Sequence, residues 1–157
     1  MKTVTRMLAA GMFLAAATSA QAEGLTTQDY IDIEQLYAQY NHAIDSCDAD
    51  GWAATFTPDG VFQRFTGREA LVGFVRQWCE KMNGAHRRHW NTNLRIMPTS
   101  DGASGAVLLM LLDVSAKPAT IASTGTYNDT LVRTAEGWRF KTRMIKGDAP
   151  AAPTAKP

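Results

Sequence analysis

Apolar residues recur along this chain with two different periods, which divide it into a mainly helical part and a mainly extended part. Between residues 26 and 46 the steps are three and four residues, the spacing of an amphipathic helix. Thr26 supplies a hydroxyl N-cap and Asp29 an acidic residue in the first turn. The stripe expected to be buried is Tyr30, Ile33, Tyr37, Tyr40 and Ile44.

Two further helices are predicted before residue 85. Residues 50–56 form a short helix, which ends at a turn signal over 57–60 and is followed by a short strand over 61–65. A third helix starts at Gly67 and ends at Asn83-Gly84, a pair that tolerates positive φ. Its apolar stripe consists of Leu71, Phe74, Val75, Trp78 and Met82.

The rest of the chain is predicted to be extended. Strands are expected over 89–97, 104–114, 119–134 and 138–146, with turns at 98–102 and 135–137. Long antiparallel strands that follow helices indicate an α+β domain with the helices on one face of a curved sheet. A sheet curled over helices leaves a cavity, which is the default ligand site.

The two ends of the chain are expected to lie outside this domain. A basic start, an apolar run over 7–17 and the motif Ala20-Gln21-Ala22 predict a signal peptide over residues 1–22, and so a periplasmic or secreted protein without membrane attachment after cleavage. The alternative is an uncleaved membrane anchor. Residues 148–157 contain three prolines and almost no large apolar side chain, which predicts a disordered tail. One domain, 23–147, remains.

Charge and cysteine content exclude some functions. The formal net charge is +1 and there is no basic stripe, which argues against nucleic-acid binding. Cys47 and Cys79 are the only cysteines, and they lie on different predicted elements. They form either one disulfide or two separate buried thiols. Neither belongs to a Cys-x-x-Cys motif, so a redox or zinc role is not expected.

The candidate chemistry lies in His89 and Asp45. An imidazole titrates near neutral pH, and a carboxylate beside it orients the ring and strengthens it as a base. Asp45, however, falls beside the apolar stripe of its helix, and His89 alone would fit an ordinary strand histidine bonded to backbone. If the fold joins the two, the protein holds a proton-abstracting dyad; otherwise it is a small binding domain.

Several strings resemble the SnoaL-like branch of the nuclear transport factor 2-like superfamily. They are Leu36-Tyr37 with Asp45 downstream, Phe56-Thr57-Pro58-Asp59-Gly60, His89-Trp90-Asn91-Thr92-Asn93-Leu94, and Gly125-Thr126-Tyr127 followed by Gly137-Trp138. The spacing of aspartate and histidine is similar to that of its small cofactor-independent lyases: hexachlorocyclohexane dehydrochlorinase, scytalone dehydratase and the bile-acid dehydratases. The resemblance implies a conical barrel, a curved mostly antiparallel sheet wrapped over three N-terminal helices.

The resemblance also implies roles for four residues. His89 takes the place of the base and Asp45 that of its partner. Tyr40 matches a tyrosine five residues before the aspartate, and Arg143 an arginine five residues after the last strand's tryptophan. The dehydrochlorinase has a lysine in place of Tyr40, so chloride elimination is not expected here. Tyr40 also fits a buried core aromatic. Strict alternation from Trp138 turns Arg143 away from the core unless a bulge intervenes.

Together these features favour elimination or isomerisation of a small hydrophobic molecule, without cofactor or metal. The alternative is a non-catalytic periplasmic carrier or sensor. Tyr40 or Asn91 is expected to donate to a developing oxyanion. The apolar run 107–112 offers side chains to both faces of its sheet, which suits a homo-oligomer, a trimer rather than a dimer. The residues expected to bind substrate are Phe62, Phe74, Trp78, Asn91 and Met110.

Overall fold

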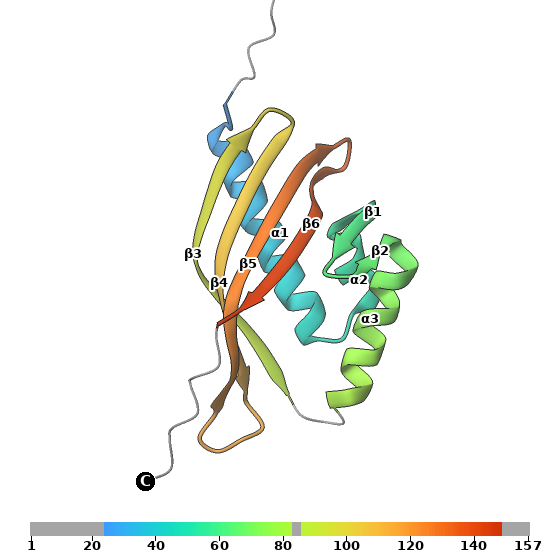
Figure 1. The fold of residues 1–157 in the computed structure, drawn as a ribbon, viewed down its shortest axis with the longest axis vertical. Helices are drawn as coiled ribbons and strands as arrows, with labels where there is room; N and C mark the ends of the chain where they lie inside the picture. The colour runs from blue at the N-terminus through green and yellow to red at the C-terminus, as the bar shows by residue number, and fades with distance from the viewer. Residues whose placement is uncertain (1–23, 83–85, 149–157) are drawn as a thin grey trace, which may run out of the picture.

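Helices cover one face of a curved six-stranded sheet (Figure 1) in the computed structural model, which describes residues 24–82 and 86–148. The predicted signal peptide lies outside these residues. Of the predicted tail only Asp148 is described, and its backbone N–H donates to the carbonyl of Thr124 at 3.2 Å. The elements are α1 (Thr27–Asp45), α2 (Ala49–Ala54), β1 (Phe56–Phe62), β2 (Phe65–Thr66), α3 (Gly67–Met82), β3 (Arg87–Thr99), β4 (Gly102–Asp113), β5 (Thr120–Thr134) and β6 (Gly137–Gly147).

Helix α1 begins where the capping pattern predicts. Thr26 Oγ1 accepts from the backbone N–H of Asp29, and the Asp29 carboxylate accepts from the backbone N–H of Thr26. Asp29 also accepts from Arg133 Nη1 at 2.6 Å and from Trp138 Nε1 at 3.0 Å. These hydrogen bonds, led by those with Thr26, lower the pKa of Asp29 to about 2. Asp29 thereby ties the start of α1 to strands β5 and β6.

The buried face of α1 differs from the prediction at two positions. Ile33, Tyr37, Tyr40 and Ile44 are buried as expected, and Leu36 joins them. Tyr30, predicted to be buried, keeps 38% of its surface exposed. At about 100° per residue Tyr30 lies on the flank of the stripe in the first helical turn, so less of the sheet covers it.

The sheet runs in the order β2-β1-β6-β5-β4-β3. Strand β1 pairs with β6 in parallel, and the other neighbours are antiparallel. The sheet curves over the helices as predicted, but it stays open, with β2 and β3 as its edges. Helix α1 packs across β3 and β6, while α3 packs against β1 and β2. The core therefore fills the concave side of the sheet.

The prediction for residues 50–65 was wrong in detail. The short helix ends at Ala54, and Phe56 begins β1. Residues 57–60, predicted as a turn, lie inside β1, where the pairing with β6 shifts register between Phe56 and Val61. A bulge accommodates these turn-forming residues within a strand. The predicted strand 61–65 is interrupted by a turn at Gln63, whose φ is 54°.

Strand β4 presents apolar side chains to both faces of the sheet, as its composition predicts. Val107, Leu109 and Leu111 are buried in the core, whereas Leu108 keeps 45% of its surface exposed on the outer face. Trp90 is 63% exposed on the same outer face, because it pairs with Met110 and turns away from His89. Among the residues described, no helix is long and apolar enough to cross a membrane.

Candidate active site

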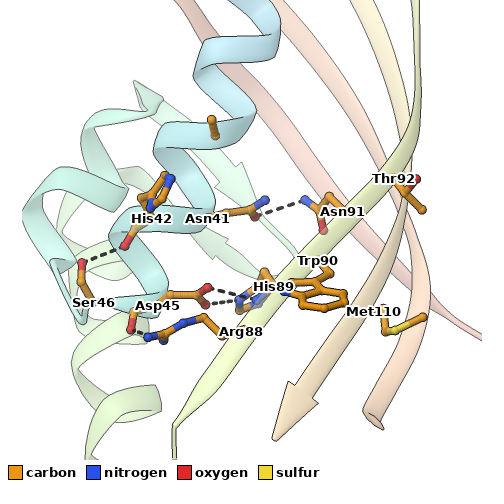
Figure 2. A pocket seen from close by; sticks show the side chains of 11 residues that line it. Asn41, His42, Asp45, Ser46, Arg88, His89, Trp90, Asn91, Thr92 and Met110 are labelled. Atoms are coloured by element: carbon orange, nitrogen blue, oxygen red, sulfur yellow. Dashed lines mark hydrogen bonds and ion pairs between the residues drawn. The ribbon is translucent and has the colours of Figure 1, made fainter. Parts of the chain in front are cut away.

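The last residue of α1 meets the third residue of β3. Asp45 Oδ1 lies 2.6 Å from Nδ1 of the His89 ring, and Asp45 Oδ2 accepts from the backbone N–H of His89 at 3.0 Å. One carboxylate therefore holds both the ring and the main chain of the same residue, as Figure 2 shows. The side chains of His89 and Asp45 are only 5% and 13% exposed.

This contact fixes the tautomer of the neutral ring. An ionised carboxylate only accepts hydrogen bonds, so His89 Nδ1 carries the hydrogen and Nε2 is the basic nitrogen. Within residues 24–82 and 86–148 no hydrogen bond is formed to Nε2. The arrangement is that of a general base with its orienting carboxylate.

His89 lines a cavity of about 230 Å³ on the core side of the sheet, here called the inner cavity. Phe62, Phe74 and Trp78 line it, as predicted from the sequence. Leu109, Leu111 and Tyr127, which were not predicted from the sequence, also line it. The polar groups in the wall come from His89, Tyr40, Tyr127, Ser123 and Thr124.

Met110, predicted to bind substrate, does not line the inner cavity. Trp90 pairs with Met110, and His89 pairs with Leu111. Since successive side chains of a strand point to opposite faces, Leu109 and Leu111 share the face of His89 and Met110 lies on the outer face.

A second hollow, the edge groove, runs along the outer edge of β3 with a volume of about 860 Å³. It is lined by Asn41, Asp45, His89, Asn91, Trp90 and Met110, among others, so the dyad borders this groove as well as the inner cavity. Figure 2 shows these side chains on both sides of β3. The groove is lined mainly by polar side chains of α1 and β3, whereas the walls of the inner cavity are mostly apolar. The inner cavity therefore excludes water better and is the more suitable site for proton abstraction. Asn91, predicted to bind substrate, lies in this groove, and its Nδ2 donates to Asn41 Oδ1 at 3.1 Å.

Tyr40 is fully buried beside the dyad. It lines the inner cavity, and its hydroxyl has no hydrogen-bond partner among the residues described. Burial raises the pKa of Tyr40 well above its usual value, so the phenol stays protonated. A protonated hydroxyl without a partner is able to donate to an oxygen atom of a ligand that comes within reach.

Arg143 faces the core because of a bulge in β6. Thr130 pairs with Thr142 but Leu131 pairs with Phe140, so Lys141 is an extra residue and strict alternation is broken. The Arg143 side chain is completely buried. It does not line the inner cavity: its guanidinium lies 4.1 Å from the ring centre of Tyr40 and 3.8 Å from that of Tyr127.

The carboxylate nearest to Arg143 is Asp129, with Oδ1 3.6 Å from Arg143 Nε. Tyr37 donates its hydroxyl hydrogen to Asp129 Oδ2 at 2.5 Å. Burial raises the pKa of Asp129 to about 6, although Arg143 and the Tyr37 hydrogen bond oppose this shift. Within the described chain the guanidinium nitrogens make no hydrogen bond, and the guanidinium lies over the rings of Tyr40 and Tyr127.

A disulfide joins the segment that follows α1 to helix α3. Cys47 and Cys79 are bonded, with Cα atoms 6.0 Å apart, which resolves the alternative left open by the sequence. Cys47 follows Asp45 by two residues, and Cys79 directly follows Trp78. The bond therefore fastens the end of α1 to the α3 wall of the inner cavity.

Histidine and aspartate are also common metal ligands, so His86, His89 and Asp45 could in principle bind a metal ion. Across the parts of the chain that the structure describes, no three His, Cys, Asp or Glu side chains come together in a group able to hold a metal ion. His86, His89 and Asp45 therefore form no such group.

Comparisons with known proteins agree with this architecture. Residues 26–144 match the model of the SnoaL-like domain. A structure of Aln2 from a Streptomyces species is 29% identical, with a TM-score of 0.73 over 80% of this chain and 95% of that one. A protein from Catenulispora acidiphila, solved in complex with S-DNPA, is 29% identical, with a TM-score of 0.69 over 78% and 96%.

A third similar structure extends the likeness in fold alone. It is an NTF2-like protein with a cystatin-like fold from Novosphingobium aromaticivorans, 21% identical, with a TM-score of 0.71 over 79% of this chain and 85% of that one. The family match spans the capping box of α1, the dyad and nearly all of the sheet. The chain belongs to the SnoaL-like family, within the NTF2-like fold.

Proposed function

We propose that this protein is a cofactor-independent lyase or isomerase that removes a proton from a carbon atom of a small, mainly apolar molecule. The observation that carries the proposal is the 2.6 Å contact between Asp45 Oδ1 and His89 Nδ1, made by a histidine that also lines the inner cavity. The family includes isomerases, dehydratases and cyclases, which is consistent with this class of chemistry.

His89 is the general base of the proposed reaction. Its Nε2 takes a proton from a carbon made acidic by a neighbouring carbonyl or leaving group. The electron pair of the broken C–H bond then expels the leaving group in an elimination. In an isomerisation it moves onto the carbonyl oxygen, and the His89 imidazolium returns the proton to another carbon of the enolate. Asp45 stabilises the imidazolium that forms, and assistance of this kind contributes about 10²–10⁴-fold to the rate.

Tyr40 is the donor that we assign to the developing oxyanion. Tyr40 lines the same cavity, and its buried hydroxyl has no hydrogen-bond partner in the described chain. Arg143 stacks against the Tyr40 ring, so a positive charge lies behind the phenol and favours negative charge in front of it. Asn91 is less suitable, because it lies in the edge groove and is bonded to Asn41.

The inner cavity limits the size of the reacting group. Ligand sites usually measure about 300–1,000 Å³, and the inner cavity, at about 230 Å³, is smaller. Only a compact, mostly apolar skeleton is compatible with walls built from Phe62, Trp78 and Leu111.

We propose that the protein acts on such a molecule after export. The signal motif Ala20-Gln21-Ala22 and the disulfide, a bond typical of oxidising compartments, support export.

A probe that requires only an apolar site and a base tests the proposal without knowledge of the substrate. In 5-nitrobenzisoxazole, removal of the C3 proton breaks the N–O bond and releases a coloured cyanophenolate. We expect the wild-type protein to accelerate this elimination and His89→Ala to fall to the rate in buffer. His42→Ala is the matched control, because His42 is exposed in the edge groove and should keep the wild-type rate.

The outcome separates the two function classes. If wild type, His89→Ala and His42→Ala all bind the probe but none accelerates its elimination, the enzyme proposal fails. The protein is then better described as a carrier or sensor with the same cavity.

A further inference from the structure

The inner cavity adjoins a third hollow, here called the basic hollow, of about 300 Å³. The two hollows share Phe62, Phe74, Trp78 and Ile145 in their walls. The basic hollow lies between α3, the end of β6 and the turn that joins β1 to β2. A molecule that passes between these shared side chains would reach from solvent to His89.

The basic hollow has a distinct charge. Arg64 and Lys81 line it, and neither forms an ion pair with any residue of 24–82 or 86–148. Arg68, by contrast, is paired with Asp50 at 2.9 Å. The Arg64 guanidinium lies 4.7 Å from the ring centre of Phe65, which helps to hold it at the rim.

Acidic side chains are absent from the described walls of this route, and the Asp45 carboxylate lies behind His89 rather than in the wall. No aspartate or glutamate is among the described residues that line the basic hollow or the inner cavity. Gln63 and Gln77 supply the uncharged polar groups of the basic hollow, and Gln63 Nε2 already donates to the carbonyl of Ile145 at 3.0 Å. The field at this hollow therefore favours anions over neutral or cationic molecules.

From these observations we infer that the ligand is an amphipathic anion. Its apolar body occupies the inner cavity next to His89, and its carboxylate or sulfonate-like group lies in the basic hollow between Arg64 and Lys81. This inference deepens the proposed function by naming the substrate class, and its binding step stands independently of turnover. It also makes the basic hollow the mouth of the inner cavity, because a charged group stays near solvent while the apolar body is buried.

Two fluorescent probes of similar shape and different charge provide the test. Anilinonaphthalene sulfonate carries one negative charge, and N-phenyl-1-naphthylamine is neutral. We would measure both dissociation constants for the wild type, for Arg64→Gln with Lys81→Gln, and for a control pair with the same loss of charge, Arg95→Gln with Lys117→Gln. Arg95 and Lys117 are exposed and lie outside both hollows.

We expect the first pair of substitutions to weaken binding of the anionic probe roughly tenfold, since each exposed charge contributes modestly. Binding of the neutral probe should change less than twofold, and the control pair should leave both probes unaffected. Each probe should displace the other, which places them in one site. Added salt should weaken binding of the anionic probe to the wild type more than its binding to the Arg64/Lys81 variant.

Three results would overturn the inference. The Arg64/Lys81 variant weakens binding of both probes equally, the control pair weakens binding of the anionic probe as much as that variant does, or neither probe binds. Its failure is distinct from that of the proposed function. If His89→Ala loses the acceleration but binds the two fluorescent probes as the wild type does, His89 remains the base. This holds whether or not Arg64→Gln with Lys81→Gln changes the binding of the anionic probe.

Discussion

Removal of the Cys47–Cys79 disulfide should destabilise the protein and disturb the dyad. The perturbation is the double substitution Cys47→Ser with Cys79→Ser, which replaces two sulfurs by hydroxyls and leaves no free thiol. The bond joins residues 32 positions apart and so closes a loop that contains α2, β1, β2 and most of α3. In the unfolded chain this loop restricts the conformations available.

The expected size follows from the loop length. For a closure of 32 residues, the chain-entropy relation gives a loss of about 12 cal/mol/K in the unfolded state. At 25 °C this corresponds to about 4 kcal/mol of stability lost when the bond is removed. Asp45, two residues before Cys47, should also become less well fixed against His89, so elimination of the probe should slow further than unfolding alone explains.

Urea unfolding followed by circular dichroism measures the effect. The free energy of unfolding of the double variant should be lower than that of the oxidised wild type by about 4 kcal/mol, and the reduced wild type should match the variant. A difference below about 1 kcal/mol would refute the reasoning, because the loop would then impose no useful restriction on the unfolded chain.

Three other predictions follow from the described contacts. Asp45→Asn and His89→Ala should each abolish most acceleration of the probe, and the double variant should lose no more than the worse single one, as steady-state rates will show. Burial raises the pKa of Asp129 to about 6, so the folded protein keeps a proton that the unfolded chain releases above about pH 4. The contribution of Asp129 to stability should therefore fall as the pH rises from about 4 to about 6, and Asp129→Asn should remove that decline in urea titrations; an unchanged slope would contradict it. Self-association through the outer face should be lost in Trp90→Lys with Leu108→Lys, and light scattering that shows a monomeric wild type would rule it out.

The sequence predicted the order of the helices and strands because each long element carries one clear period. It also brought His89 and Asp45 together as a hypothesis, but only with the help of the family resemblance. Periodicity alone placed Asp45 on the flank of its helix. Asp45 reaches β3 because α1 ends at that residue and lies against the edge strand, which is a property of the tertiary arrangement.

The features that the sequence did not predict depend on strand register. The bulge at Lys141 turns Arg143 into the core, and nothing in the composition of β6 marks that position. Met110 and Leu111 are equally apolar, and only the pairing of His89 with Leu111 decides which of them faces the cavity. A shift of one residue exchanges the two faces of a strand, so such assignments require the structure.

The deuterium isotope effect on probe elimination tests proton removal by His89 most directly. The rates of wild type with 5-nitrobenzisoxazole carrying hydrogen or deuterium at C3 should differ severalfold, because the C–H bond breaks in the transition state that the base stabilises. In His89→Ala the rate should equal that of buffer for both isotopologues. Acceleration by the wild type without an isotope effect, or acceleration with the effect retained in His89→Ala, would contradict the assignment of His89 as the base.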